Sequence, residues 1–316
     1  MKELIAMLKK NTARLFAGGL FIALAATGCT TVSQAQAPQG AGAPELGSAS
    51  TATLGVNEAA RALLPAEISE AGVLRIASDP TYPPFEFYDT DNKTLIGWDA
   101  DMGDAIGAVL GLEVEHVPAT FDTILPGLAS GKYDLGMSTF SVTDERRKVV
   151  DFVPYLQGGT GLAVAPGNPE KLSVDAATLC GKAVAAQKGS IQSLDILPAF
   201  SKECTEAGNP AIDMQFFPTQ NDANLALTSG RVQGVMADSV SLAYQGKLAD
   251  GKFEVAEGPD YEPELTGTAL GKKSELLPAI QAATQAVLES PVYAEINSKW
   301  GLPSSTEITP ADVVLK

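Results

Sequence analysis

The chain has 316 residues, a formal net charge of −16 at pH 7, a single histidine and three cysteines. This length can hold two domains. The sequence is acidic and contains no basic stripe, which excludes charge-driven binding to nucleic acid, because such binding needs clustered Lys and Arg. So few histidines and cysteines exclude most His/Cys metal sites. We therefore expect no metal, no cofactor and no nucleic-acid partner.

Residues 1–28 have the pattern of a secretory signal peptide. Basic residues between Lys2 and Arg14 precede the apolar run Leu15–Ala26, which is too short for a comfortable membrane span. The segment ends in Ala-Thr-Gly before Cys29 and resembles a bacterial lipobox, in which the cysteine is lipidated and becomes the mature N-terminus. The alternative is ordinary cleavage that leaves Cys29 unmodified.

Residues 29–62 predict a flexible tether. Up to about Asn57 the segment is rich in Ala, Gly, Ser, Thr, Gln and Pro, so it cannot bury enough apolar surface to fold. No second apolar stretch is long enough to span a bilayer. We expect a globular body that begins near Leu63 and is held off the membrane by this tether.

From Val73 onward, short apolar runs alternate with helix-like segments. A strand–helix–strand rhythm predicts α/β layers with a largely parallel sheet. Strands are expected at Val73–Ser78, Val114–Pro118, Tyr133–Met137, Leu162–Ala165, Ala183–Ala186, Met214–Phe217, Gly234–Ala237 and Leu265–Gly271. Helices are expected at Asp99–Leu110, Asp122–Ser130, Ser190–Phe200, Gln220–Ser229, Ser239–Lys247, Leu276–Glu289 and Val292–Trp300.

The segment Met137–Arg147, with the sequence MSTFSVTDERR, has the composition of a carboxylate receptor. Three hydroxyl residues follow Met137, Thr143 is a natural N-cap, and Arg146 lies in the first turn of the helix that would begin there. Hydroxyls, backbone N–H groups at a helix start and a guanidinium fork together bind carboxylates well. The alternative is that the hydroxyls only cap the helix and Arg146 lies in solvent.

Cys180 and Cys204 lie 24 residues apart in the second set of strands and helices. Because the chain is predicted to be exported, we expect these two residues to form a disulfide. The alternative is two buried free thiols. Cys29 is then the odd cysteine, which suits lipidation. The single histidine, His116, lies in a strand-like run and is interpreted as an exposed strand residue rather than a catalytic base.

Three blocks of the sequence resemble, in order and spacing, a known family. Ser78–Phe87 (SDPTYPPFEF), Gly97–Asp101 (GWDAD) and Met137–Arg147 are similar to blocks of the polar amino-acid family, family 3, of solute-binding proteins of ABC importers. The resemblance covers about Val73–Trp300. It implies an α/β, two-lobed periplasmic-binding-protein type II (Venus-flytrap) fold with two hinge crossings and the ligand between the lobes.

The first lobe of that family is discontinuous in sequence. The break at Gly158–Gly161, after which the strand–helix rhythm restarts, matches the point where the chain leaves it. We place lobe one at residues 63–159 and 259–316, and lobe two at residues 160–258.

The resemblance also implies roles for the matching residues at the charged ends of the ligand. Arg146 matches the arginine that pairs with the α-carboxylate, and Ser141 matches a residue whose backbone N–H and hydroxyl reach the same group. Ser138 and Thr139 match positions that bind the α-ammonium through carbonyl or hydroxyl oxygens. Asp238 matches the acid that pairs with this ammonium.

Other matching residues surround the rest of the ligand. The loop Ser190, Ile191 and Gln192 matches one that donates a further N–H to the carboxylate, and Ile191 stands at a position that helps to set specificity. Tyr82 and Phe121 match the walls beside the ligand side chain. Asp79 matches an acid at its far end. The alternatives are that the two aromatic residues only pack in the core and that Asp79 and Asp238 only cap a following turn or helix.

The leading hypothesis is a lipid-anchored, monomeric receptor at the cell surface or in the periplasm. It would capture a polar or basic free amino acid and deliver it to an ABC permease, with Cys29 holding it on the outer face of the membrane. One alternative is an enzyme on the same fold, such as a cyclohexadienyl or arogenate-type dehydratase, because fold alone does not decide function. Another is the sensor module of a signalling protein, which would normally carry a transmembrane helix and a cytoplasmic domain after lobe one.

Overall fold

The structure, a computed structural model, describes residues 54–315. The predicted signal peptide, the lipobox with Cys29 and the tether up to residue 53 lie outside the described residues. None of the helices in the described range has both the length and the apolar character needed to cross a membrane.

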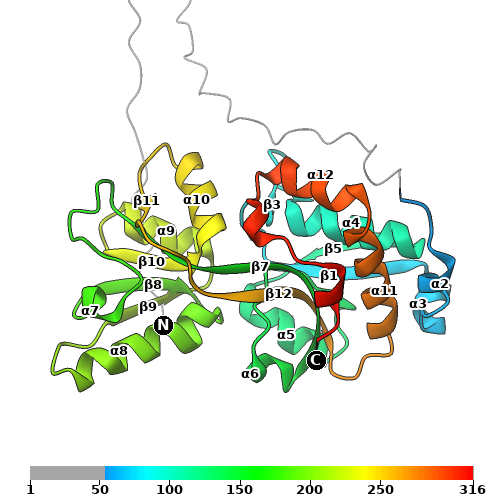
Figure 1. The fold of residues 1–316 in the computed structure, drawn as a ribbon, viewed down its shortest axis with the longest axis horizontal. Helices are drawn as coiled ribbons and strands as arrows, with labels where there is room; N and C mark the ends of the chain where they lie inside the picture. The colour runs from blue at the N-terminus through cyan, green and yellow to red at the C-terminus, as the bar shows by residue number, and fades with distance from the viewer. Residues whose placement is uncertain (1–53, 316) are drawn as a thin grey trace, which may run out of the picture. The chain divides into compact units, whose positions relative to one another are not determined.

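The described chain forms two groups of α/β elements (Figure 1). The first group precedes a long strand, β7 (Val150–Val164), and the second lies between β7 and another long strand, β12 (Tyr261–Gly271). The first group contains α2 (Glu58–Arg61), α3 (Ala66–Ala71), β1 (Val73–Ser78), β2 (Thr81–Tyr82), β3 (Glu86–Tyr88), β4 (Leu95–Ile96), α4 (Trp98–Leu110), β5 (Glu113–Pro118), α5 (Phe121–Ala129), β6 (Leu135–Gly136) and α6 (Asp144–Arg147).

The second group follows β7, and the chain then returns through β12 to the first. The second group contains α7 (Ala176–Leu179), β8 (Ala183–Gln187), a π-helical turn η1 (Gln192–Ile196), α8 (Leu197–Glu206), β9 (Asp213–Phe217), α9 (Gln220–Thr228), β10 (Gly234–Asp238), α10 (Ser239–Leu248) and β11 (Glu254–Val255). After β12 come α11 (Leu277–Leu288), α12 (Pro291–Trp300) and two 3-10 turns, η2 (Ser304–Thr306) and η3 (Pro310–Val313).

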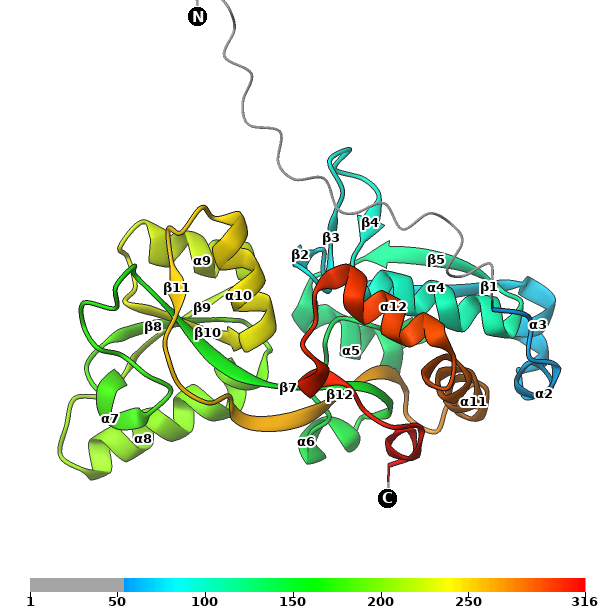
Figure 2. The ribbon, with the colours of Figure 1, turned by 45° about the horizontal axis from the view of Figure 1, so that its top comes forward.

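One mixed sheet connects the two groups. Its strand order is β5-β1-β6-β12-β7-β10-β8-β9, with β11 added against β7. β1 pairs in parallel with β5 and β6, and β8 pairs in parallel with β9 and β10. β7 and β12 are antiparallel to each other and run side by side between the groups (Figures 1 and 2). These two strands are the two crossings that the resemblance implied.

The β7 strand serves both groups because its two halves have different partners. Val153 pairs with Thr268 of β12 in the first half, and Thr160 pairs with Asp238 of β10 in the second. Almost all of its side chains are buried, which explains the nearly continuous apolar run in the sequence. The sequence predicted a break at Gly158–Gly161, but the structure continues the strand through it.

The largest core lies under α4, α11 and α12, which pack together on the first group (Figure 2). Trp98 at the start of α4 is fully buried, its ring lies 5.1 Å from that of Tyr155, and its Nε1 donates to Asn297 Oδ1 at 2.7 Å. Trp98 is therefore a packing residue of this core. Gly97 before it allows close backbone approach, because a Cβ there would lie 2.1 Å from the carbonyl oxygen of Phe85.

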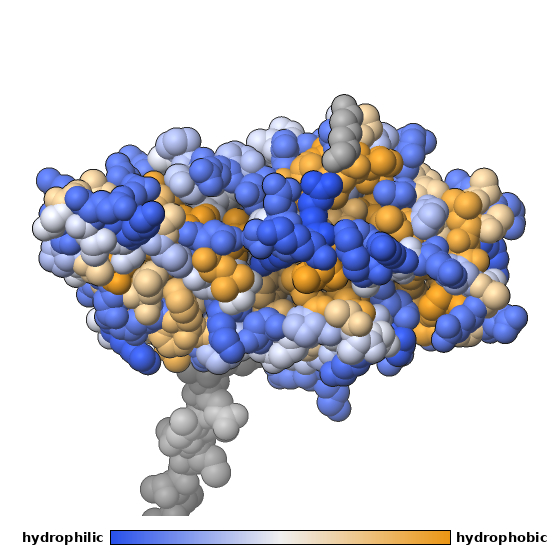
Figure 3. All heavy atoms as spheres, turned by 90° about the horizontal axis from the view of Figure 1, so that it is seen from below, coloured by the Kyte–Doolittle hydropathy of each residue, from blue (hydrophilic) through white to orange (hydrophobic). Residues whose placement is uncertain are grey.

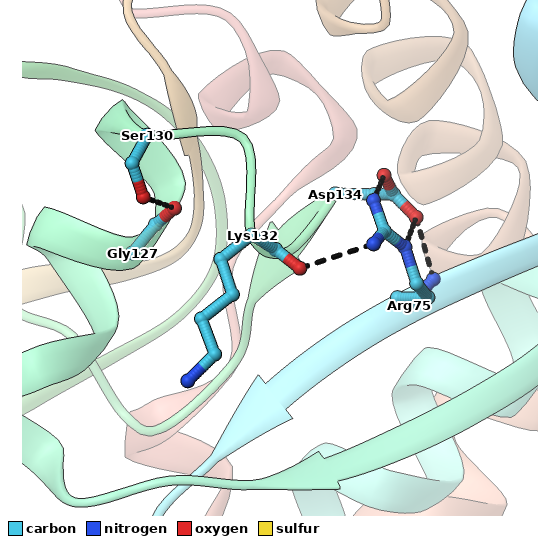
Figure 4. A network of polar contacts seen from close by, with 5 residues as sticks. All are labelled: Arg75, Gly127, Ser130, Lys132 and Asp134. Carbon is cyan, nitrogen blue, oxygen red and sulfur yellow. Dashed lines mark hydrogen bonds and ion pairs between the residues drawn. The ribbon is translucent and has the colours of Figure 1, made fainter.

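A partly exposed ion pair fixes the approach to β6 (Figure 4). Arg75 of β1 donates two side-chain hydrogen bonds to Asp134, at 3.1 and 2.8 Å, and its backbone N–H donates a third to the same carboxylate. A further guanidinium N–H reaches the carbonyl of Lys132. The bidentate pair ties the loop before β6 to β1, and the segment beginning at Ser138 follows directly.

Three predicted boundaries are corrected by the structure. The tether was predicted to extend to residue 62, but α2 begins at Glu58, capped by Asn57, and buries Ala60 in the main core. The strand predicted at Tyr133–Met137 is shorter in the structure, where only β6 (Leu135–Gly136) is strand and the residues on either side lie in loops. The helix predicted at Ser190–Phe200 begins instead as the π-helical turn η1.

His116, predicted to be exposed, is partly buried, and its Nε2 lies 3.0 Å from Asp104 Oδ1.

Hydrophilic residues form a band across the middle of the face seen in Figure 3, with apolar residues exposed on either side. The large exposed apolar side chains include Leu225 and Leu194. Single apolar side chains of this kind are ordinary on a protein surface.

Cys180 and Cys204 form the predicted disulfide, which links the end of α7 to α8 in the second group. Cys204 is buried in the core of that group. The cross-link therefore fastens two helices on one side of the sheet.

Replacing both cysteines, as Cys180→Ser with Cys204→Ser, should lower the free energy of unfolding by about 3 kcal/mol. The cross-link spans 24 residues, and the unfolded chain gains the freedom of that loop when it is removed. Urea unfolding of the double variant beside a Cys29→Ser control, which keeps the pair, measures the difference. Full alkylation of Cys180 and Cys204 without reductant would contradict the pairing.

Candidate functional site

A pocket lies where the two groups of elements and the crossing strands meet. Both groups contribute side chains to it, and β7 and β12 contribute part of its wall. It is lined by Tyr82, Phe121, Ser138, Thr139, Ser141, Arg146, Gly158, Gly159, Thr160, Gln187, Ser190, Ile191, Gln192, Asp238, Glu262 and Thr266. Ten of the eleven ligand-binding residues predicted from the sequence are in this set.

Arg146 is a buried cation that lacks an anionic partner. It lies in α6, whose N-cap Thr143 accepts a hydrogen bond from the Arg146 N–H, as the sequence predicted. Its guanidinium donates to two backbone carbonyls, those of Ser141 at 2.9 Å and Gly189 at 3.0 Å. Among the described residues no carboxylate lies within ion-pair distance of it. Burial lowers the pKa of Arg146 to about 10.

Asp238 is the opposite case, an anion without a cationic partner. It ends β10 and caps α10, where its Oδ1 accepts the Ser241 N–H at 3.0 Å. A Cβ at Gly158 would lie 2.7 Å from Asp238 Oδ2, so the glycine leaves room for the carboxylate. Burial raises the pKa of Asp238 to about 7, and the nearby Asp260 adds to the shift. No lysine or arginine of the described chain forms an ion pair with it.

The Ser138 and Thr139 side chains turn away from the role expected for them. Ser138 Oγ donates to Glu86 Oε1 at 2.6 Å and accepts the Asp79 N–H at 3.1 Å. The Thr139 hydroxyl faces Glu86 Oε2, and its N–H donates to Asp99 Oδ2 at 2.8 Å. The hydroxyls are therefore engaged inside the protein, which leaves the backbone carbonyls as the groups able to accept from an ammonium.

The second group supplies the loop from Ser190 to Gln192, as expected. The Gly189 N–H donates to Ser193 Oγ at 3.0 Å, and this hydrogen bond shapes the loop. Gln192 Nε2 donates to Thr160 Oγ1 at 2.8 Å and fixes the loop to β7. The helical start that follows is the turn η1.

Two aromatic residues, Tyr82 and Phe121, form part of the pocket wall. Phe121 stacks on Phe140 with ring centroids 4.7 Å apart, and the Arg146 guanidinium lies 5.8 Å from the Phe121 ring. Tyr82 accepts the Asp238 N–H through its hydroxyl at 2.9 Å. Both residues also belong to core clusters, so the packing role and the pocket role hold together.

Asp79 differs from its prediction, because it does not line the pocket. It is 3% exposed, and its carboxylate accepts from Thr81 Oγ1, the Phe121 N–H and Gln187 Nε2, at 2.8, 2.9 and 3.0 Å. Burial raises its pKa. In this arrangement Asp79 supports the wall behind Phe121 and Gln187 instead of contacting a ligand.

Contacts between the two groups close over the pocket. Besides the Arg146–Gly189 bond, Gln187 of β8 donates to Asp79 at the end of β1, and Lys188 Nζ lies 2.8 Å from Asp122 Oδ2. Ser241 Oγ donates to the Pro83 carbonyl at 2.8 Å. In this structure the two groups therefore touch each other beside the pocket.

Sequence reasoning missed several pocket residues, and all but Gln187 lie on the crossing strands. The Gly-Gly-Thr-Gly segment contains three of them, Gly158, Gly159 and Thr160, but the sequence indicated it only as a boundary between lobes. Pairing of β7 with β12 is what places the break and its partners in the wall. The missed lining residues are Gly158, Gly159, Thr160, Gln187, Glu262 and Thr266.

The sequence that forms this site matches a known family of proteins. The family model of the bacterial extracellular solute-binding proteins, family 3, matches residues 74–303. The chain belongs to this family. Within the curated relatives, the arginine-binding protein ArgT of Corynebacterium glutamicum is 32% identical over 242 residues, which cover 77% of this chain and 78% of ArgT.

Solved structures are similar over the same region. An ancestral arginine-binding protein bound to arginine is 34% identical with a TM-score of 0.64, and the match covers 72% of this chain and 98% of that one. The ancestral amino acid-binding protein AncCDT-1, a precursor of cyclohexadienyl dehydratase, is 32% identical with a TM-score of 0.63, covering 74% and 97%. The predicted two-lobed type II α/β fold of family 3 is confirmed.

No group of three or more His, Cys, Asp or Glu side chains in residues 54–315 is placed to hold a metal ion. The pocket instead combines a guanidinium, two carboxylates, hydroxyls and backbone groups. Such a set can bind a small polar molecule that carries both charges.

Asp238→Asn should stabilise the ligand-free protein increasingly as the pH rises from about 4 to about 7. The folded state holds the Asp238 proton more tightly than the unfolded chain, so ionisation of this group lowers stability across that window. Asparagine keeps an oxygen for the α10 cap but does not titrate. Urea unfolding of both proteins at several pH values measures the difference, and a constant difference across the window would contradict the raised pKa.

Proposed function

We propose that this protein is the substrate-binding component of an ABC importer and that it captures a free polar or basic amino acid between its lobes. The observation that carries the proposal is the pair Arg146 and Asp238. Both are charged side chains in one pocket, and neither has a partner of opposite charge. An α-amino acid supplies both missing partners at once.

The energetics favour this ligand over a singly charged one. A buried charge is tolerated only when it is paired and hydrogen-bonded. A carboxylate alone would satisfy Arg146 and leave Asp238 unpaired, while an amine alone would do the reverse. A zwitterion pairs with both, and its carboxylate fits the two-pronged guanidinium.

The charge of the pocket supports a basic side chain on the ligand. Once the α-groups are paired with Arg146 and Asp238, Glu262 of β12 remains as an additional acid in the lining. An extra cationic group on the ligand would meet this carboxylate. The similarity to arginine-binding proteins supports the same choice.

Ligand binding would be coupled to closure of the lobes. We place lobe one at residues 63–159 and 259–316, with α2 added at its start, and lobe two at residues 160–258. Arg146 belongs to the first and Asp238 to the second, so one ligand pulls them together. Motion about β7 and β12 is the hinge expected for such a closure.

We favour a binding protein over an enzyme of the same fold. The similarity to a precursor of cyclohexadienyl dehydratase keeps that reaction class open. However, pairing with the two charges of a zwitterion accounts for both Arg146 and Asp238 as binding groups. Prolonged incubation with a cyclohexadienyl substrate should therefore yield no product, whereas an amino acid should give a finite binding heat.

Arg146→Ala and Asp238→Ala should each weaken amino-acid binding by roughly thirty- to several-thousand-fold. Removing one member of a buried charged pair costs about 2–5 kcal/mol, because the other charge stays buried without its partner. A thermal-shift screen of the twenty amino acids selects the ligand, and calorimetric titration then compares the variants with the parent.

Lys148→Ala is the matched control for the arginine variant. It removes a positive charge from the end of the same helix, but its side chain is exposed and, among residues 54–315, pairs only with the exposed Glu145. Its affinity should equal that of the parent. Parent-like affinity in Arg146→Ala or Asp238→Ala would place that residue outside the site and remove the basis of the proposal.

We further propose that the receptor is monomeric, that it is anchored by lipid on Cys29 to the outer face of the membrane, and that its partner is the permease of the importer. The support is the sequence of residues 1–29, with its basic start, apolar run and lipobox.

Cys29→Ser should release the protein from the membrane fraction, because the lipid attachment atom is gone. Fractionation followed by mass spectrometry of the N-terminal peptide measures both location and modification. Membrane retention of the Cys29→Ser variant, or an unmodified Cys29 in the parent, would contradict the anchor while leaving the amino-acid site unaffected.

A further inference from the structure

Two carboxylic acids are buried together beneath the pocket, outside the lining described above. Glu86 of β3 and Asp99 of α4 are each 1% exposed. Ser138 Oγ donates to Glu86 Oε1 at 2.6 Å, and the Thr139 N–H donates to Asp99 Oδ2 at 2.8 Å. Tyr155 of β7 donates its hydroxyl proton to the same Asp99 oxygen at 3.0 Å. The two acids therefore hold two successive residues of the pocket wall.

The backbone brings the two acids together through Gly97. Its carbon lies so close to the Phe85 carbonyl that any side chain at Gly97 would clash. The Asp99 N–H donates to the Phe85 carbonyl at 2.8 Å, which joins the start of α4 to the residue before Glu86. Each acid thus comes from one of the sequence blocks, PPFEF and GWDAD.

Electrostatics allow only one negative charge at this place. After burial, the negative charge of Asp99 does most to raise the pKa of Glu86, and Asp79 at the end of β1 adds to the shift. The Tyr155 hydroxyl faces the pair, and burial raises the pKa of Tyr155 well above its ordinary value. Burial raises the pKa of Asp99 to about 7 and that of Glu86 well above its ordinary value. No cation among the described residues pairs with either acid.

The hydrogen bonds identify which acid keeps the proton. Asp99 lies in the first turn of α4, where the helix dipole favours a negative charge, and its Oδ2 accepts two hydrogen bonds. Its Oδ1 is buried without a hydrogen-bond partner. A protonated Glu86 supplies the missing donor, so the pair is one carboxylic acid beside one carboxylate.

The pair holds a backbone conformation that the pocket needs. Thr139 has a φ of 51°, in the left-handed region that a β-branched residue rarely adopts. Strain of this kind persists only where surrounding contacts enforce it. The Asp99 bond to the Thr139 N–H and the Glu86 bond to Ser138 enforce it from below, which aims the backbone between the two residues at the pocket.

We propose that Glu86 and Asp99 share one proton and act as a positioning pair that sets Ser138 and Thr139 for ligand binding. The binding measurements that test this proposal rest on the amino-acid-binding function proposed above. It predicts that a neutral hydrogen-bonding group at position 86 suffices and that a second negative charge there disrupts the wall.

Glu86→Gln and Glu86→Leu separate positioning from mere packing. Glutamine is neutral like the protonated acid, can accept from Ser138 and can donate to Asp99, so its affinity for L-arginine at pH 7.5 should stay within about threefold of the parent. Leucine fills the space but leaves the Ser138 hydroxyl proton without its acceptor and Asp99 Oδ1 without a donor, and the affinity of this variant should fall about tenfold or more. Circular dichroism and unfolding curves verify that each variant is folded.

The pH profile supplies a readout that packing would not change. Loss of the shared proton at higher pH places two anions under Thr139, so parent affinity should fall relative to Glu86→Gln between pH 6 and pH 9. Titration of Asp238 and of the ligand affects both proteins equally and cancels in the ratio of their dissociation constants. Glu113→Gln, which neutralises an exposed acid on β5, should follow the parent at every pH.

A ligand-free measurement keeps this proposal distinct from the proposed function. Both acids bind protons more tightly in the folded protein, so the parent should lose stability relative to Glu86→Gln as the pH rises above about 4 toward and beyond 7. If no amino acid binds, the function fails and this arm still tests the pair. A pH-independent difference, parent-like binding by Glu86→Leu, or equally weak binding by both variants would overturn the proposal.

Discussion

The structure depends on two opposite charges that lack partners within the described chain. Arg146 and Asp238 are held in one pocket by hydrogen bonds to backbone groups, which fix their positions without neutralising them. Burying a charge costs free energy unless an opposite charge accompanies it. The fold keeps both charges available, and a ligand that carries a carboxylate and an ammonium relieves both costs together.

The two crossing strands make this arrangement possible. β7 enters the second group as a partner of β10, and β12 returns beside β7, so the two halves are joined by paired backbone. Arg146 precedes the first crossing and Asp238 precedes the second. Residues distant in sequence are thereby placed around one pocket, and contacts such as Lys188–Asp122 close its edge.

Beneath the pocket, the polar side chains are arranged to serve its wall. Asp79 accepts three hydrogen bonds, and Glu86 and Asp99 hold the Ser138–Thr139 backbone from below. The buried acids around the pocket of this family 3 protein are therefore used in two ways. Asp238 faces the ligand space, whereas the other three shape the surface that a ligand would meet.

The sequence by itself determined the order of most elements, the N-cap at Thr143 and the disulfide partners, because periodicity, capping and cysteine pairing can be recognised in the sequence. Ten of the lining residues followed from the resemblance of its motifs to those of the family. Only the tertiary structure decided that Asp79 lies behind the wall, that Glu86 meets Asp99, and that Glu262 enters the lining. Those outcomes depend on which side chains converge when β7, β12 and α4 pack. Hydrogen bonds between residues far apart in sequence decide them, and no single stretch of sequence carries that information.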